Sequence, residues 1–130
     1  MEVLFRGTTE AGFNRSSKMY TEFYSVPRYG PSKKYTTDWV QALGYAMQYA
    51  VEYRTNGLVI VLLNSDKYRF SQFTNEWFEI LDPINLSDTL ILREGQNLDD
   101  LCAFPRLGVF QTREVTRRVI SEIRRNFERT

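Results

Sequence analysis

The sequence predicts an α+β fold, in which short strands do not alternate regularly with helices. Residues 39–54 and 112–127 carry apolar side chains at steps of three and four, a spacing typical of amphipathic helices. Short apolar runs elsewhere are bounded by Gly, Pro, Asn or Asp, which is typical of strands. A chain of 130 residues is long enough for one continuous core, so we expect residues 1–130 to form a single domain.

The first third of the chain should hold a strand, a loop and the start of a helix. Residues 3–6 have the composition of a short buried strand. Residues 10–31 contain Gly, Asn, Ser and Pro without a sustained period, which predicts a long loop. The aromatic residues of this loop either offer stacking surfaces to a ligand or fold back onto the core: Tyr20, Phe23, Tyr24 and Tyr29.

The clearest helix follows Thr37 and Asp38, which are suited to cap it, and runs to about Arg54. Asn56 and Gly57 tolerate the left-handed conformation and should end the helix. Its apolar residues are Trp39, Ala42, Leu43, Ala46, Met47, Ala50 and Tyr53.

Three strands and a second helix are expected after residue 57. Residues 58–63 form a continuous apolar run suited to a buried strand, and shorter strands are predicted at 77–81, before Asp82 and Pro83, and at 89–92. Thr112 is a plausible cap for a C-terminal amphipathic helix. The apolar face of that helix is Val115, Val119, Ile120, Ile123 and Phe127.

Composition excludes several classes of protein. The hydrophobic fraction of 42% and aromatic fraction of 15% exclude a disordered chain, and no apolar run reaches the roughly 18 to 20 residues of a membrane span. The first residues show no basic leader followed by an apolar segment, so we expect no secretion signal, no membrane partner and a cytoplasmic location.

The absence of histidine and the single cysteine exclude much catalytic chemistry. One cysteine cannot form an internal disulfide, and a metal cluster of His and Cys ligands is impossible. Ser-His and Cys-His nucleophile pairs are excluded as well, so catalysis must use carboxylates, hydroxyls, arginine or lysine, with no metal expected. Cys102 lies in an apolar stretch and is interpreted as a buried small hydrophobic residue.

The net charge of +1 conceals two segments of opposite sign. Residues 76–100 are mainly acidic, with Glu76, Glu79, Asp82, Asp88, Glu94, Asp99 and Asp100 against Arg93. The tail is basic, with Arg113, Arg117, Arg118, Arg124, Arg125 and Arg129. The arginine-rich helix is compatible with an ordinary solvated surface or with a face for nucleic acid or an acidic partner.

Two short motifs suggest a site for an anionic ligand. Arg6 and Gly7 end an apolar strand and put a fixed cation beside an unhindered backbone N–H. If Tyr35, Thr36 and Thr37 lie beside them at the start of a helix, the group outlines a pocket for phosphate and ribose. Glycine-rich dinucleotide motifs and the Walker motif are absent, so a Rossmann fold and a nucleoside triphosphatase are not supported.

A third motif places Glu79 between Phe78 and Ile80 on a predicted strand. Successive side chains of a strand alternate between its two faces, so Glu79 points away from both apolar neighbours. It is therefore either a solvent-facing residue or a site residue.

The order of these motifs resembles that of the mono-ADP-ribosyltransferase superfamily, the small NAD-consuming toxins and their relatives. Members carry Arg or His on a first strand, an aromatic-Ser-Thr strand leading into a helix, and later a catalytic Glu before an apolar pair. The resemblance covers residues 3–83 through Arg6-Gly7, Tyr35-Thr36-Thr37 and Glu79. It implies a compact core of short, mainly antiparallel strands with a helix after the second motif, beside the C-terminal helix.

The resemblance also implies roles for these residues, with NAD as substrate. Arg6 would hold the phosphate or nicotinamide ribose, and the Gly7 backbone would pair with the nicotinamide amide. Thr36 and Thr37 would brace that geometry, and Tyr35 would stack on the nicotinamide ring. Glu79 would bond the ribose 2′-hydroxyl and stabilise positive charge on the sugar as nicotinamide leaves.

The acceptor side departs from the family pattern. Members that modify arginine carry a second Glu or Gln two residues before the catalytic one, where this chain has Trp77, and Glu76 lies three residues before Glu79. On the acceptor side the candidate residue is therefore Glu76, and the acceptor is an unknown protein or nucleic acid. The alternative function is a non-catalytic interaction module that binds nucleic acid or an acidic protein through the basic C-terminal helix. The oligomeric state is not predicted.

Overall fold

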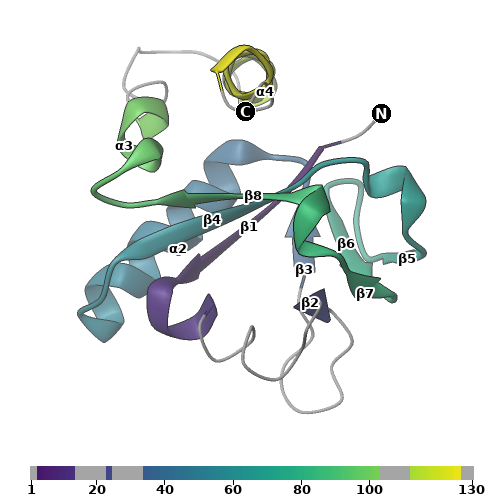
Figure 1. Ribbon diagram of the computed structural model, residues 1–130, viewed down its shortest axis with the longest axis horizontal. Coiled ribbons are helices and arrows are strands. Elements are labelled where there is room, and N and C mark those ends of the chain that lie inside the picture. The colour runs from purple at the N-terminus through teal and green to yellow at the C-terminus, as the bar shows by residue number, and fades with distance from the viewer. Residues whose placement is uncertain (1–2, 14–22, 25–33, 103–111, 127–130) are drawn as a thin grey trace.

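The computed structural model describes residues 3–13, 23–24, 34–102 and 112–126, and they form an α+β fold around an antiparallel sheet (Figure 1). The sheet has six strands in the order β5-β6-β3-β1-β4-β8. Their bounds are β1 (Leu4–Thr9), β3 (Lys34–Thr36), β4 (Gly57–Leu62), β5 (Phe70–Gln72), β6 (Trp77–Ile80) and β8 (Thr89–Arg93). Strands β2 (Phe23–Tyr24) and β7 (Pro83–Ile84) form a separate antiparallel pair.

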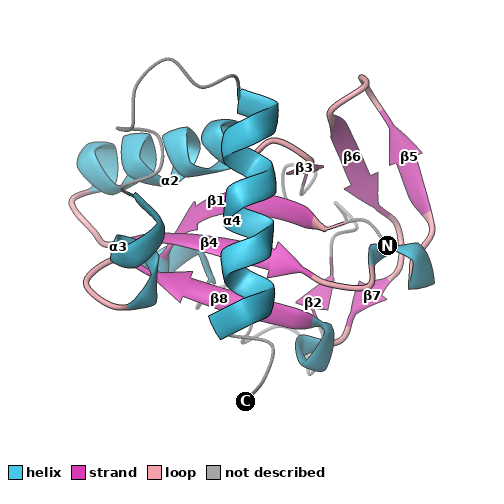
Figure 2. Ribbon diagram, turned by 90° about the horizontal axis from the view of Figure 1, so that it is seen from above, coloured by secondary structure: helices cyan, strands magenta, loops and turns pink. Residues whose placement is uncertain are grey.

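Within the described residues, three helices lie on the same side of the sheet: α2 (Trp39–Tyr53), α3 (Asn97–Cys102) and α4 (Thr112–Asn126). Figure 2 shows α4 crossing over β1, β4 and β8. Strands β5 and β6 lie at a steep angle to these three strands. Two short 3-10 helices, Ser65–Lys67 and Leu86–Asp88, connect strands. The predicted α+β class is confirmed, and none of the described helices is long and apolar enough to cross a membrane.

Helix α2 begins and ends close to the predicted residues. Asp38 is extended, and its Oδ1 accepts the Val40 N–H at 2.9 Å, which caps the first turn. The last turn ends at Arg54, which adopts the left-handed conformation predicted for Asn56 and Gly57. Tyr53 is 65% exposed, so its predicted place on the apolar face is wrong.

The predicted loop over residues 10–31 is wrong at two places. Residues 10–13 are helical, and Phe13 packs into the core on the sheet face opposite α2. Phe23 and Tyr24 form β2, which pairs with Ile84 and Pro83. Backbone pairing with β7 therefore organises part of a segment whose sequence has no strand period. The predicted stacking roles of Tyr20 and Tyr29 lie outside the described residues, as do the side chains of Phe23, Tyr24 and Cys102.

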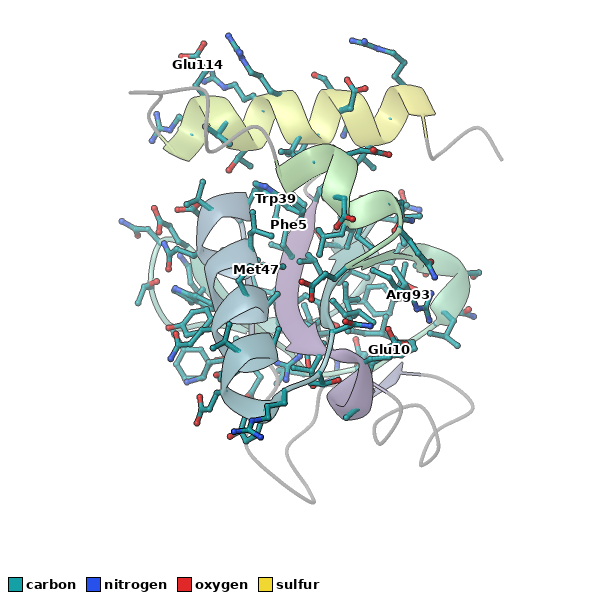
Figure 3. The ribbon with its side chains drawn as sticks, turned by 90° about the vertical axis from the view of Figure 1, so that its left-hand side faces the viewer. Phe5, Glu10, Trp39, Met47, Arg93 and Glu114 are labelled. Carbon is teal, nitrogen blue, oxygen red and sulfur yellow. The ribbon has the colours of Figure 1, made fainter. Side chains whose placement is uncertain are left out.

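Each face of the sheet carries its own core. Strand β4 is buried at all six residues because it lies between β1 and β8 and is covered on both faces. On the helix side, Phe5 packs edge to face against Trp39, with ring centroids 5.4 Å apart (Figure 3). The opposite core is built from Leu4, Phe13, Tyr35, Leu58, Ile60, Leu62, Phe78, Ile80 and Ile84.

Helix α4 is part of the helix-side core. Val115, Val119 and Ile123 are buried, as their spacing predicted, and Phe127 lies outside the described residues. The Thr116 hydroxyl accepts the N–H of Trp39 at 3.0 Å in a buried position. This bond satisfies a backbone donor in the first turn of α2 that has no partner within its own helix. The C-terminal helix is thus fastened to the start of α2.

Gly7 allows α2 to lie directly against β1. A Cβ atom at this position would lie 2.0 Å from the carbonyl oxygen of Ala42 and 2.8 Å from the nitrogen of Ala46. Both are backbone atoms of α2 and cannot rotate away. Only glycine therefore permits this separation between strand and helix.

The exchange Gly7→Ala should lower the free energy of unfolding by about 3 kcal/mol, because strand and helix must move apart. Gly44→Ala is the matched control, since a Cβ there meets nothing within 4 Å and alanine is the better helix former. Gly44→Ala should raise stability by about 0.5 to 1 kcal/mol. Urea unfolding monitored by circular dichroism measures both values, and equal effects of the two changes would contradict the close approach.

Asp88 is a buried carboxylate held by neighbouring side chains. It is 6% exposed, accepts a hydrogen bond from the Tyr68 hydroxyl, and lies 3.1 Å from Lys67 Nζ. The Tyr68 hydrogen bond, followed by those from Lys67 and Asn64, lowers the pKa of Asp88 below its ordinary value. Since the folded-state pKa is depressed, this carboxylate stabilises the fold above its unfolded pKa of about 3.9.

We expect Asp88→Asn to lower the free energy of unfolding at pH 7 by about 1 to 3 kcal/mol. The difference from the original protein should shrink as the pH falls through the folded-state pKa, because Asp88 is then protonated in both states. Asp66→Asn is the control, because Asp66 is an exposed neighbouring residue, and it should change the free energy of unfolding by less than about 0.5 kcal/mol. Urea titrations at several pH values test this, and an Asp88→Asn effect that is independent of pH would contradict it.

Candidate functional site

A cleft of about 460 Å³ opens where β1, β3 and β6 meet α2. This volume lies within the range of sites for small organic ligands. Within the described part of the chain, two cations and four aromatic rings contribute to its lining. The lining residues are Arg6, Gly7, Lys34, Tyr45, Tyr49, Phe73, Thr74 and Trp77.

Arg6 reaches the cleft because the sheet opens between β1 and β3. The two strands share one registered pair, Phe5 with Thr36, whereas β1 and β4 are paired along all six residues of β1. The Arg6 guanidinium lies beside this opening and donates a long hydrogen bond of 3.4 Å to the Lys34 carbonyl. Burial lowers the pKa of Arg6, partly offset by Tyr35 and Tyr49, but arginine remains charged at neutral pH.

The second cation and the rings surround this guanidinium. Lys34 Nζ lies 4.3 Å from the centroid of the Phe73 ring, a cation-π contact at the rim. Tyr45 stacks on Tyr49 at 6.0 Å and meets Trp77 edge to face at 5.7 Å. The rings thus come from both sides of the cleft, from α2 and from the β5-β6 hairpin. They offer stacking surfaces to a flat ligand.

The cleft is electropositive. Its described lining contains no carboxylate, and the ion pairs found among the described residues use neither Arg6 nor Lys34. Arg6 is half-buried and Lys34 is exposed, and a partly buried cation without a carboxylate partner is stabilised when a ligand supplies negative charge. The lining therefore suits an anionic ligand that also carries a flat ring.

Glu79 lies beside the cleft. It pairs with Lys34 in the β3-β6 ladder, so the two Cβ atoms are neighbours on one sheet face, at a separation of about 4.5 to 5.5 Å. Trp77 shares that face by strand alternation. Glu79 is half-buried, and its carboxylate makes no hydrogen bond or ion pair with the side chain of any described residue. Its carboxylate is therefore available at the edge of the cleft.

The residues of the second motif have structural positions. Tyr35 exposes none of its surface and belongs to the core on the face opposite α2, so its ring does not line the cleft. The hydroxyl of Thr36 is buried and accepts the Asp38 N–H at 3.0 Å. Thr37 donates its N–H to the Glu76 carbonyl at 3.0 Å. Thr36 and Thr37 thus brace the turn from β3 into α2 and fasten it to β6.

Glu76 lies on the other side of Trp77, in a network centred on Gln41. The Gln41 amide donates to Glu76 Oε2 at 2.6 Å and to Asp38 Oδ2 at 3.1 Å. Its Oε1 accepts the indole N–H of Trp77 at 2.9 Å. Gln41 therefore joins a wall of the cleft to Glu76, which borders a second, polar groove at the start of α4.

Of the residues that the sequence suggested for the site, Arg6 and Gly7 line the cleft, whereas the rest of the lining was not predicted. Tyr45 and Tyr49, with Tyr53, are spaced four residues apart on a predicted helix, which signals an aromatic stripe. Lys34 precedes Tyr35 on a strand and so faces the opposite side. Nothing in the sequence indicates that Phe73 lines a cleft. It directly follows β5, whose three residues are all exposed and show no strand period.

The described ranges contain no group of three or more acidic, His or Cys side chains placed to hold a metal ion. Comparison with known proteins gives no relative: no family model, no curated protein and no solved structure matches this chain. Function is therefore argued from the cleft and its residues.

Proposed function

We propose that the protein is an NAD-dependent mono-ADP-ribosyltransferase, which cleaves nicotinamide from NAD and transfers ADP-ribose to a macromolecular acceptor. One observation carries this proposal. The strands of Arg6, of Tyr35 and Thr36, and of Glu79 are separated by up to about seventy residues in sequence but lie next to one another as β1, β3 and β6. They border an electropositive, aromatic cleft, as a site for NAD requires.

The cleft offers each part of NAD a complementary surface. Arg6 and Lys34 supply positive charge for the pyrophosphate, and guanidinium groups bind phosphate through paired N–H donors. The absence of a side chain at Gly7 leaves the strand backbone open to the nicotinamide amide. Tyr45 and Tyr49 take the stacking role that the sequence assigned to Tyr35, because their rings, unlike that of Tyr35, line the cleft.

Glu79 is the proposed catalytic residue. Cleavage of the bond between nicotinamide and ribose C1′ builds positive charge on the sugar, and a nearby carboxylate stabilises it. The half-buried position beside Lys34 and the lack of a described partner keep this carboxylate available for the ribose 2′-hydroxyl. The mechanism uses no histidine, in keeping with the composition.

A cytoplasmic location remains a prediction.

Replacing the carboxylate by an amide should separate binding from chemistry. Glu79→Gln should lower the rate of nicotinamide release at least 100-fold, because the amide carries no negative charge, and should leave the Kd for NAD within about threefold. Glu52→Gln, an exposed carboxylate on α2, is the matched control and should retain full activity. Chromatography of released nicotinamide measures the rate.

Full activity of Glu79→Gln would contradict the catalytic assignment. A wild-type protein that neither binds NAD nor releases nicotinamide would reject the transferase and favour the alternative, a non-catalytic interaction module.

Tryptophan fluorescence should report NAD binding directly. The chain has two tryptophans, and Trp39 is fully buried while Trp77 lines the cleft. NAD should therefore quench the emission of Trp77, and Trp77→Phe should abolish the quenching. Arg6→Gln should raise the Kd from this titration about 10- to 100-fold, because it removes hydrogen bonds from a charged donor.

Arg124→Gln removes an arginine that is exposed on α4 and lines none of the described cavities, so it should leave the titration unchanged. Equal effects of Arg6→Gln and Arg124→Gln would show that NAD does not bind in this cleft.

A further inference from the structure

We propose that the acceptor is a single-stranded nucleic acid, held in a groove beside the NAD cleft. This inference rests on the proposed transferase function and names the substrate class that the function leaves open. The groove measures about 630 Å³ and lies between the start of α2, the β5-β6 turn and the start of α4. Its described lining is Thr37, Asp38, Asn75, Glu76, Arg113, Thr116 and Arg117.

The groove and the cleft share a wall. Trp77 lines the cleft, and its indole N–H is bonded to Gln41, which in turn holds Glu76 at 2.6 Å. Glu76 and Trp77 are consecutive residues, yet one borders the groove and the other the cleft. A strand bound in the groove would therefore lie next to the NAD cleft, separated from it by this single hydrogen-bonded layer. Its target nucleotide must pass the edge of this layer to reach ribose C1′.

One wall of the groove is cationic. Arg113 and Arg117 lie one turn apart on α4, with Cβ atoms about 5 to 6 Å apart, and both are exposed. Among the described residues neither is in an ion pair, whereas Arg118 lies 4.0 Å from Glu114 and Arg125 lies 3.6 Å from Glu122. Two adjacent arginines without carboxylate partners are suited to successive phosphates of one strand.

The facing wall carries hydrogen-bonding groups and negative charge: Asn75, Glu76 and Asp38. A nucleic-acid strand has anionic phosphates along one edge and neutral bases along the other, and the bases offer amino donors to such a wall. An acidic peptide would bring its carboxylates against Glu76 and Asp38 as well as against the arginines. The division of charge across the groove therefore favours nucleic acid over an acidic protein.

A single strand fits better than a duplex. Base edges are free in a single strand but paired in a duplex, and only a free base can turn toward Asn75 and Glu76. In the transfer step a base or sugar nucleophile bonds to ribose C1′ while the bond from C1′ to nicotinamide breaks. The bonding electrons pass to the nicotinamide nitrogen, which becomes neutral, and the nucleophile's proton passes to Glu76 and then to water.

Two measurements on the full chain test the inference. Fluorescein-labelled 16-nucleotide single strands containing all four bases, as DNA and as RNA, are titrated by fluorescence anisotropy at two salt concentrations, with the DNA duplex as comparison. Labelled NAD is then added, and the label on the strands is counted. We expect at least one single strand to bind more tightly than the duplex, to weaken with salt and to accept label.

Substitutions locate the bound strand. Arg113→Glu and Arg117→Glu should each weaken binding at least tenfold and lower the salt slope by about one. Arg124→Glu makes the same charge change on the same helix outside the groove and should weaken binding less than threefold. Thermal unfolding of all three variants verifies that they are folded.

The two proposals fail in different ways. If the protein releases nicotinamide but labels only proteins in a lysate and no single strand, the nucleic-acid acceptor is rejected and the transferase stands. If no nicotinamide is released, the transferase is rejected, and with it the acceptor inference. Equal loss of binding in the Arg117→Glu and Arg124→Glu variants would reject the groove as the binding site.

Discussion

The close contact between α2 and β1 determines how near the helix lies to the sheet, and the rest of the helix-side core packs around it. Gly7 has no side chain, and the helix approaches so near that a single Cβ would collide with the backbone of Ala42. Gly57 on β4 also lies close to this helix, since a Cβ there would make a tight contact of 3.0 Å with the Ala46 carbonyl oxygen. A helix held at this distance directs Tyr45 and Tyr49 to the edge of the sheet, beside Arg6. The close approach at Gly7 thus places the α2 wall of the cleft.

The opening between β1 and β3 supplies the second requirement of the site. A fully paired ladder there would continue the sheet past Phe5, but one registered pair leaves the guanidinium of Arg6 beside the cleft instead. The turn that follows β3 is held tightly, because Thr36 and Asp38 bond within it and Gln41 links it to β6. The open site is therefore bounded by rigid elements, which suits a site that must orient a ligand.

Much of the fold follows from local signals in the sequence, and most of the site does not. The Asp38 cap, the apolar run of β4 and the spacing of Val115, Val119 and Ile123 each have a local physical cause. Strands β2 and β7 pair with each other across about sixty residues of sequence, and β5 pairs with β6 in a hairpin, although the residues of β2, β5 and β7 show no strand period. The burial of Tyr35 and the exposure of Tyr53 depend on which elements dock against them. Lining residues such as Lys34 and Phe73 meet only after the sheet has formed.

In the proposed function, the cleft between β1, β3 and α2 binds NAD with its nicotinamide end beside Glu79. A crystal structure of the Glu79→Gln variant soaked with NAD tests this most directly, because the intact dinucleotide should persist. We expect the pyrophosphate near Arg6 and Lys34, a ring stacked on Tyr45 or Tyr49, and the nicotinamide ribose beside residue 79. NAD bound elsewhere, or a cleft that stays closed to it, would contradict the proposed site.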